Sequence, residues 1–271
     1  MRVLQVDSQA FHHQPYLCAA SGGGTESLSL PFQRGRVEGL PDGLDALVLT
    51  SDLQGVAPSW RDDGATALLG EVVVDVLEQL SDSGQIPPLW ECGAVLAGDL
   101  YSTMDARKRG ASGDVRSVWT RFAESFRWVA GAPGNHDRFG TAKERMRLSA
   151  QPNIHLLDGA LMNVDGLRIA GVGGITAPEH KLHKGGRRLV AEQLSLVHEA
   201  AEASPDILVL HEGPAGIEPG QRGHTAITDV LRERTPPLVV CGHVHWTEAL
   251  SPLADGHVVN VDARVVVLTR A

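Results

Sequence analysis

The sequence predicts an α/β fold in which a β-sheet is buried between helices. Short, uninterrupted apolar runs recur along the chain, and such runs are typical of buried strands. Amphipathic patterns, in which apolar residues repeat every three or four positions, separate several of these runs and indicate helices. The order is mostly strand, helix, strand, helix and becomes strand-rich toward the end, which favours a sheet packed between helices.

The first half of the chain holds the clearest alternation. Residues 3–6 predict a short strand, and residues 19–45, rich in Gly, Ser and Pro, predict a loop with a hairpin as an alternative. The next predicted elements are a strand at 46–50, a helix at about 65–80, a strand at 94–97, a helix carried by Val115, Val118, Trp119, Phe122 and Phe126, and a strand at 128–130.

The second half continues with strands and one further helix. The predicted elements are strands at 154–157 and 167–172, a helix marked by Val190, Leu194, Val197 and Ala201, and strands at 207–210, 238–241, 258–261 and 265–268. Because no repeat or linker divides the chain, we expect a single domain over residues 1–271. It would comprise a core at 46–271 and an extension at 1–45, which could cover a sheet edge, form a partner surface or cap the active site.

Composition and charge limit the classes of protein to which this chain could belong. With 271 residues, 42% of them hydrophobic and 21% charged, the chain is typical of a globular protein. A net charge of −9 argues against a dedicated nucleic-acid binder, which needs clustered Lys and Arg. Three scattered cysteines are too few for a disulfide framework. No apolar stretch approaches the roughly 18 residues of a membrane-spanning helix, and residues 3–6 are too short for a signal peptide, so we expect a cytoplasmic protein.

Metal-ligating residue types follow several of the predicted strands. Gly98-Asp99, Gly134-Asn135-His136-Asp137, His211 and Gly242-His243-Val244-His245 occur in this order. Carboxylate and amide oxygens and imidazoles that converge from strand ends can hold two divalent ions and leave a face open for substrate. Asp99 is the natural bridging ligand, and alternation along an extended segment predicts that His243 and His245 lie on the same side.

These blocks resemble the calcineurin-like metallophosphoesterase superfamily, whose pattern is Asp-x-His, Gly-Asp, Gly-Asn-His-Asp/Glu, His and Gly-His-x-His. The resemblance covers residues 46–270 and implies a four-layer αββα sandwich of two mixed β-sheets flanked by helices. It also implies hydrolysis of a phosphomonoester or phosphodiester by a metal-bound hydroxide at a dinuclear centre. Mn²⁺ is the first candidate cofactor, with Fe, Zn or Mg as alternatives. The strand-turn-strand pattern after Asp137 favours a bacterial phosphodiesterase-like branch.

The resemblance also implies a role for each matching residue. Asp99 would bridge the two ions. A first metal position would use Asp52, Gln54 and His245, and a second would use Asn135, His211 and His243. His136 would be the acid that faces the leaving group, and Asp137 would orient it.

Gln54 departs from the pattern, because the superfamily has His at this place. Its amide oxygen could bind a metal more weakly than imidazole does, or Gln54 could only hydrogen-bond to a ligand. Tyr101 is a possible substitute ligand. Asp7 with Gln9 offers a rival first block, but its long separation from Asp99 favours Asp52.

Substrate contacts are less specified by the sequence. Arg138 and His224 are candidates, and two basic clusters, 107–109 and 181–188, are either solvated loops or phosphate-binding groups. We expect a small phosphorylated substrate, with a nucleotide as one option. Two rival functions stay open: a nuclease of the same superfamily, and a catalytically weak binding or regulatory protein that keeps one metal.

Overall fold

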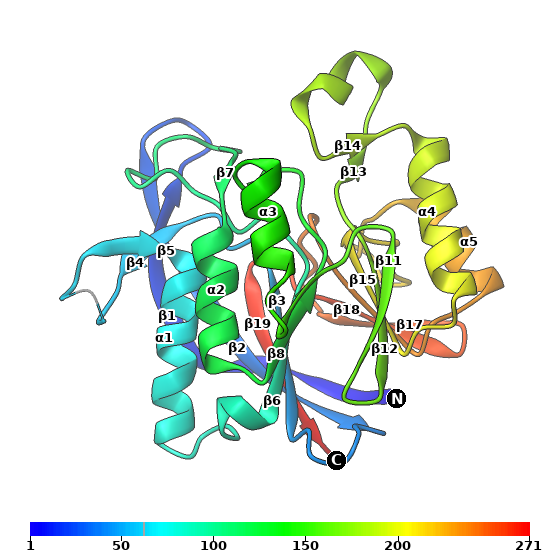
Figure 1. Ribbon diagram of the computed structural model, residues 1–271, viewed down its shortest axis with the longest axis horizontal. Helices are drawn as coiled ribbons and strands as arrows, with labels where there is room; N and C mark the ends of the chain where they lie inside the picture. The colour runs from blue at the N-terminus through cyan, green and yellow to red at the C-terminus, as the bar shows by residue number, and fades with distance from the viewer. Residues whose placement is uncertain (62) are drawn as a thin grey trace.

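Two β-sheets face each other in the middle of the molecule, and helices cover their outer faces (Figure 1). The computed structural model describes residues 1–61 and 63–271. The nine-stranded sheet contains, in spatial order, β10 (Ile154–Leu156), β8 (Trp128–Gly131), β6 (Cys92–Leu96), β3 (Ala46–Ser51), β19 (Arg264–Arg270), β2 (Thr25–Glu38), β1 (Arg2–Ala19), β4 (Val56–Pro58) and β5 (Thr66–Leu68). The six-stranded sheet contains β11 (Ala160–Val164), β12 (Leu167–Val172), β15 (Ile207–Glu212), β16 (Leu238–Gly242), β18 (Gly256–Asn260) and β17 (Leu250–Leu253).

The helices form the two outer layers. On the side of the nine-stranded sheet lie α1 (Leu69–Asp82), α2 (Arg116–Ser125) and α3 (Ala142–Ser149), and on the side of the six-stranded sheet lie α4 (Val190–Glu202) and α5 (Thr225–Glu233). Short elements complete the fold: η1 (Leu89–Glu91), η2 (Glu179–Lys184), and the two-stranded pairs β7 (Gly113–Asp114) with β9 (Asp137–Arg138) and β13 (Ile175–Thr176) with β14 (Arg187–Arg188). Among the described helices, none combines the length and the hydropathy needed to cross a membrane.

Three apolar clusters hold the four layers together. One lies between α1, α2 and the nine-stranded sheet, one lies between the sheets, and one lies between the six-stranded sheet and α4 and α5. Strand β3 shows why its run is apolar throughout: Ala46 and Val48 face the helices, and Leu47 and Leu49 face the second sheet. A strand buried on both faces needs apolar residues at every position. The predicted sandwich of two mixed sheets flanked by helices is confirmed.

Most of the predicted elements after residue 46 are confirmed, with boundaries displaced by a few residues. The expected helix at 65–80 begins only at Leu69, because residues 66–68 form β5. Helices α3 and α5 were not predicted. Most side chains of α3 are polar and only Leu148 is buried, so an apolar period is nearly absent there.

The prediction of a loop over residues 19–45 is wrong for most of the segment, whereas the alternative, a hairpin, is confirmed in part. Strands β1 and β2 form a long antiparallel hairpin, paired from Arg2 with Glu38 to Ala19 with Thr25. Strand β2 also pairs in parallel with β19, so the hairpin is built into the nine-stranded sheet. Three register shifts interrupt the pairing of β1 with β2, at β-bulges or other irregularities, which bend and twist a strand pair. Its tip, residues 16–28, reaches toward the loops that follow β3 and β6.

The loops that carry the metal-ligating motifs meet at one edge of the two sheets. Strands β3, β6 and β8 run parallel to one another, as do β15 and β16, so their carboxyl ends lie at a common edge. Two hydrogen bonds given by backbone nitrogens then join the loops. Asp52 N donates to Gly98 O (2.9 Å), and His243 N donates to the side-chain Oδ2 of Asp52 (2.8 Å). The second of these bonds links the two sheets.

Two glycines let these loops approach closely. A Cβ added at Gly134 would overlap the backbone nitrogen and the carboxylate of Asp99. A Cβ added at Gly242 would overlap the Ser51 hydroxyl and the Asp52 carboxylate. The glycine in each motif therefore leaves the space in which the acidic side chains of the neighbouring loop lie.

Replacing Gly134 with Ala should lower the free energy of unfolding by about 1–3 kcal/mol, because the new methyl group would push against backbone that has no room to move. Urea denaturation of the metal-free protein measures this change. Gly22→Ala is the matched control, since a Cβ there has no heavy atom within 4 Å. Equal stability of the two variants would contradict the described contact between the loops.

Candidate metal centre

Three side chains from both sheets converge on one point. Potential ligand atoms of Asp99, His211 and His243 all lie within 4.8 Å of one another. Asp99 follows β6, His211 lies in β15, and His243 follows β16. Asp99 is 2% exposed and His211 is fully buried, so the group is shielded from water on most sides.

The orientation of His211 is fixed by one hydrogen bond. Its Nδ1 lies 2.7 Å from the carbonyl oxygen of Ala97, and because a carbonyl only accepts, Nδ1 carries the hydrogen. The other ring nitrogen, Nε2, then faces Asn135 Oδ1 at 3.2 Å and Asp99 Oδ2 at 3.4 Å. In neutral His211 this would place three lone pairs against one another in a buried site. A cation between them removes that repulsion.

The shifted pKa values of His211 and Asp99 also indicate that a positive charge belongs between the two side chains. Burial alone would lower the pKa of His211, but the Asp99 carboxylate outweighs it and raises that pKa to about 10. Burial would raise the pKa of Asp99, and His211 and His136 instead lower it to about 2. A proton therefore occupies the place between the two side chains when no other cation is bound.

The ligand types at this point fit a divalent metal. Asp99 and Asn135 offer oxygens, His211 and His243 offer imidazoles, and this mixture suits first-row divalent ions. Asn135 is 1% exposed, and the rings of His211 and His243 have their centroids 5.1 Å apart. The four residues expected at the second metal position, counting Asp99 as the bridge, are thus brought together.

The residues expected at the first position are arranged differently. Asp52 Oδ2 accepts from the Ser51 hydroxyl (2.7 Å) and from His243 N (2.8 Å). Gln54 lies beside the centre, and its Nε2 donates to Asp99 Oδ2 (2.9 Å). Because a carboxylate only accepts, the amide nitrogen of Gln54, and not its oxygen, faces Asp99.

The expectation that His245 lies on the same side as His243 is wrong. Strand β16 ends at Gly242, His243 has a φ of 68°, and Val244 N donates to Gly242 O (2.8 Å), so the segment turns instead of continuing as a strand. The side chain of His245 is 56% exposed. It lines a separate hollow with Gln33 and Arg264, beside the middle of β1 and β2.

His136 lies at the centre but is not oriented by Asp137. Its backbone nitrogen donates to Asp99 Oδ1 (2.8 Å), and its Nδ1 lies 3.0 Å from the Ser112 hydroxyl. Burial lowers the pKa of His136. The ring also lies against Gly110, which lines the adjoining cavity.

Asp137 instead holds the two motif loops together. Its carboxylate accepts from the backbone nitrogens of Asp99 (2.9 Å), Leu100 (2.8 Å) and Gly134 (2.8 Å). Burial, with the Asp99 carboxylate nearby, raises the pKa of Asp137 to about 6. We therefore correct the expected role: among the described residues, Ser112 is the side-chain partner of His136, and Asp137 shapes the backbone.

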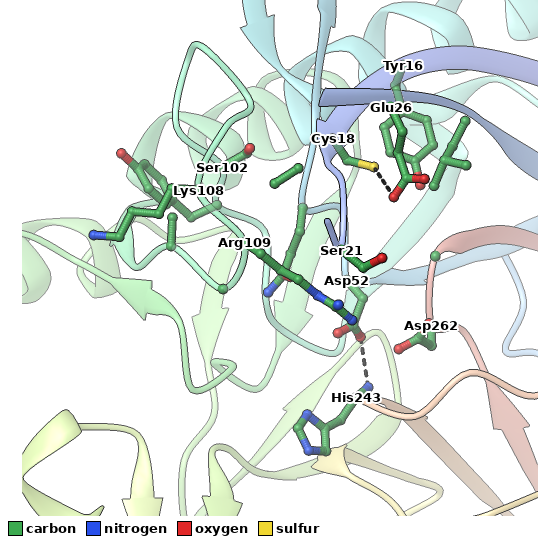
Figure 2. Close-up of a pocket in the computed structure, with 17 residues that line it drawn as sticks. Tyr16, Cys18, Ser21, Glu26, Asp52, Ser102, Lys108, Arg109, His243 and Asp262 are labelled. Carbon is green, nitrogen blue, oxygen red and sulfur yellow. Dashed lines mark hydrogen bonds between the residues drawn. The ribbon is translucent and has the colours of Figure 1, made fainter. Parts of the chain in front are cut away.

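A cavity of about 360 Å³ adjoins the centre (Figure 2). Its walls come from the hairpin tip, from the segment 101–111, from residues 262–263, and from Asp52, Gln54 and His243. Figure 2 shows the Arg109 side chain extending toward Asp52, whereas Lys108 points away. The N-terminal extension therefore forms one wall of this cavity.

The predicted substrate contacts lie outside this cavity. Arg138 donates to the carbonyl oxygen of Lys184 (2.9 Å) and lines a neighbouring hollow. His224 precedes α5, and its backbone nitrogen donates to Gly213 O (3.0 Å). Of the two basic clusters, the one at 107–109 supplies two cavity residues, Lys108 and Arg109, whereas Arg188 in the other pairs with Asp158 (2.6 Å).

The alternatives that the sequence offered for the first block, Tyr101 and Asp7, lie in different surroundings. Tyr101 does line the cavity, where its ring packs on Gly113. Asp7 of the rival block is exposed on β1. Ser112, Asp262 and Arg264 belong to no recognisable motif, and only their spatial proximity to His136 and His245 draws attention to them.

Comparison with known proteins agrees with this geometry. The family model described as "Calcineurin-like phosphoesterase" matches residues 47–247. A search of curated protein sequences found no match.

Solved structures share the fold at low sequence identity. The crystal structure of TT1561 of Thermus thermophilus is 20% identical, with a TM-score of 0.53, and the match covers 81% of this chain and 90% of that one. A second crystal structure is 14% identical, with a TM-score of 0.53 and coverage of 82% and 91%. A 5'-nucleotidase precursor from Thermus thermophilus is 15% identical and gives a TM-score of only 0.38, and the match covers 83% of this chain and 48% of that one. The segment matched by the family model includes β15, which carries His211, and the loops after β3, β6, β8 and β16, which carry the other candidate metal ligands. The chain belongs to the calcineurin-like phosphoesterase family.

Proposed function

We propose that this protein hydrolyses a small phosphoester with the help of a divalent metal ion held by Asp99, Asn135, His211 and His243. The observation that carries this proposal is the buried His211 Nε2, which faces two oxygen acceptors at 3.2 and 3.4 Å. Such a group needs a proton or a metal ion among its members, and its oxygen and imidazole ligands suit a divalent metal. A divalent ion bound there would neutralise phosphoryl charge and activate water, which is the chemistry that phosphoester hydrolysis needs.

His136 is the proposed acid for the leaving group. It lies beside Asp99 and against the cavity wall, and the Ser112 hydroxyl restrains its Nδ1. The lowered pKa of His136, caused first by burial, makes its protonated form a stronger acid. The imidazolium would donate a proton to the departing oxygen, which otherwise leaves as an unstable alkoxide.

The cavity supports a small substrate with a second anionic group. At about 360 Å³ it is in the lower range of small-molecule sites, and Arg109 offers a guanidinium that suits a phosphate or carboxylate. The proposal covers monoesters and diesters, and a nucleotide is one candidate. A nuclease is less favoured, because the net charge is −9 and the hairpin tip closes one side of the cavity. In keeping with a small metabolite as substrate, we propose a cytoplasmic location.

A metal-binding protein without turnover is the second candidate. It is favoured by Gln54, which donates to Asp99, and by His245, which lies away from the centre. The proposed acid His136 argues for the enzyme, since binding alone needs no leaving-group acid.

The primary test is hydrolysis by metal-stripped protein to which Mn²⁺ is added back. We expect turnover of p-nitrophenyl phosphate or bis-p-nitrophenyl phosphate that requires the metal, and the preferred compound distinguishes a monoesterase from a diesterase. His136→Ala should keep its metal and lose roughly 10²-fold or more in kcat on esters with poor leaving groups. Asp99→Asn, the control, should lose both metal and turnover.

Two results would contradict this assignment. Metal content that collapses in His136→Ala would make His136 a ligand rather than an acid. Bound metal without hydrolysis of any ester tested would favour the binding protein.

Arg109→Ala should raise KM about tenfold or more for a substrate with a second anionic group, because a charge-assisted hydrogen bond is worth about 1.5–3 kcal/mol. Its effect on kcat should be small, since Arg109 lies on the cavity wall. Arg107→Ala is the matched control, because Arg107 is exposed as Arg109 is but is not among the cavity residues. Equal KM values for the two variants would remove Arg109 from the substrate site.

A further inference from the structure

We infer that this chain binds one divalent ion, and that a contact between Arg264 and His245 takes the place of the expected first metal position. The inference rests on the proposed metal centre, but it concerns the number of ions and not turnover. The two positions differ in how their polar atoms are satisfied.

Both ring nitrogens of His245 are engaged by the protein. Nε2 lies 3.3 Å from Arg264 Nη2, and because a guanidinium only donates, Nε2 must accept. Nδ1 then carries the hydrogen and lies 3.1 Å from the carbonyl oxygen and 3.3 Å from Oδ1 of Asp262. In this arrangement His245 has no lone pair left for a metal.

Arg264 cannot easily release His245. It is 3% exposed at the start of β19, and its Nη1 donates to Gln33 Oε1 (3.2 Å) and to Thr247 O (3.4 Å). Its Nη2 also donates to the carbonyl oxygen of Trp246. Withdrawing a buried guanidinium from such partners is costly. A metal on Nε2 would lie about 2 Å from that nitrogen, close to this fixed positive charge.

The remaining members of the first position, Asp52 and Gln54, also form hydrogen bonds within the protein. Gln54 fills the place of the family's His and gives an N–H to Asp99 Oδ2. Asp52 Oδ2 receives two hydrogen bonds, from Ser51 and from the backbone of His243. At the second position, by contrast, His211 Nε2 and two oxygen acceptors, at 3.2 and 3.4 Å, surround a place that only a proton or a metal ion can fill.

Metal titration of the chelator-treated full chain tests this inference. Bound Mn²⁺ per chain is measured by elemental analysis after gel filtration, and electron paramagnetic resonance reports whether two Mn²⁺ ions are exchange-coupled. We expect one ion per chain at saturation and the spectrum of isolated Mn²⁺. Two ions per chain, coupled or not, would overturn the inference.

Paired histidine variants locate the bound ion. His245→Ala, at an exposed position, should leave both stoichiometry and affinity unchanged, whereas His243→Ala should weaken binding at least tenfold. Loss of an ion in His245→Ala would show that His245 is a ligand after all and overturn the inference. Loss of a second ion in Asp262→Asn would also overturn the inference.

The proposed function fails in a different way. One bound ion without ester hydrolysis would contradict the enzyme and leave the single-ion inference standing. Ester hydrolysis by a protein with two bound ions would support the enzyme and overturn the single-ion inference.

Discussion

The contact between Asp99 and His211 is the constraint on which the rest of the centre depends. Asp99 follows a strand of one sheet and His211 lies in a strand of the other, so their pairing fixes the distance between the sheets at this edge. His211 also donates to the carbonyl oxygen of Ala97, which precedes the Gly98-Asp99 motif directly. A buried carboxylate and imidazole are stable here because a cation, either a proton or a metal, lies between them.

The surrounding structure serves to keep that pair in place. Strands with both faces buried leave little freedom in the position of their carboxyl ends, and Gly134 lets the two motif loops of the nine-stranded sheet touch. Asp137 then ties these loops through three backbone nitrogens. Asp137, which follows the proposed catalytic His136 in sequence, therefore acts on the backbone. The backbone in turn determines where the side chains of Asp99 and His136 point.

The fold and the meeting of Asp99, His211 and His243 could be predicted from sequence, but the placement of His245 and the extension could not. Apolar runs in fully buried strands leave a strong signal, and Gly-Asp and Gly-Asn-His motifs after them indicate ligands at the strand ends. The β1–β2 hairpin leaves a weak signal, because most of the residues toward its tip are exposed and polar or small. The direction of His245 depends on a positive φ at His243, a conformation that a Gly-His-x-His motif does not reveal.

The hairpin and the altered first position are connected in space. Gln33 lies in β2, donates to the carbonyl oxygen of Asp7 in β1, and accepts from Arg264, which in turn contacts His245. Strand β2 pairs with β19, so the hairpin lies directly beside the segment that carries Arg264. The N-terminal hairpin that lines the cavity thus also supplies Gln33, which helps to hold Arg264 against His245. On the single-ion inference, an internal hydrogen-bond network takes the place of a metal ligand in this chain, and Asp99, Asn135, His211 and His243 would hold the one bound ion.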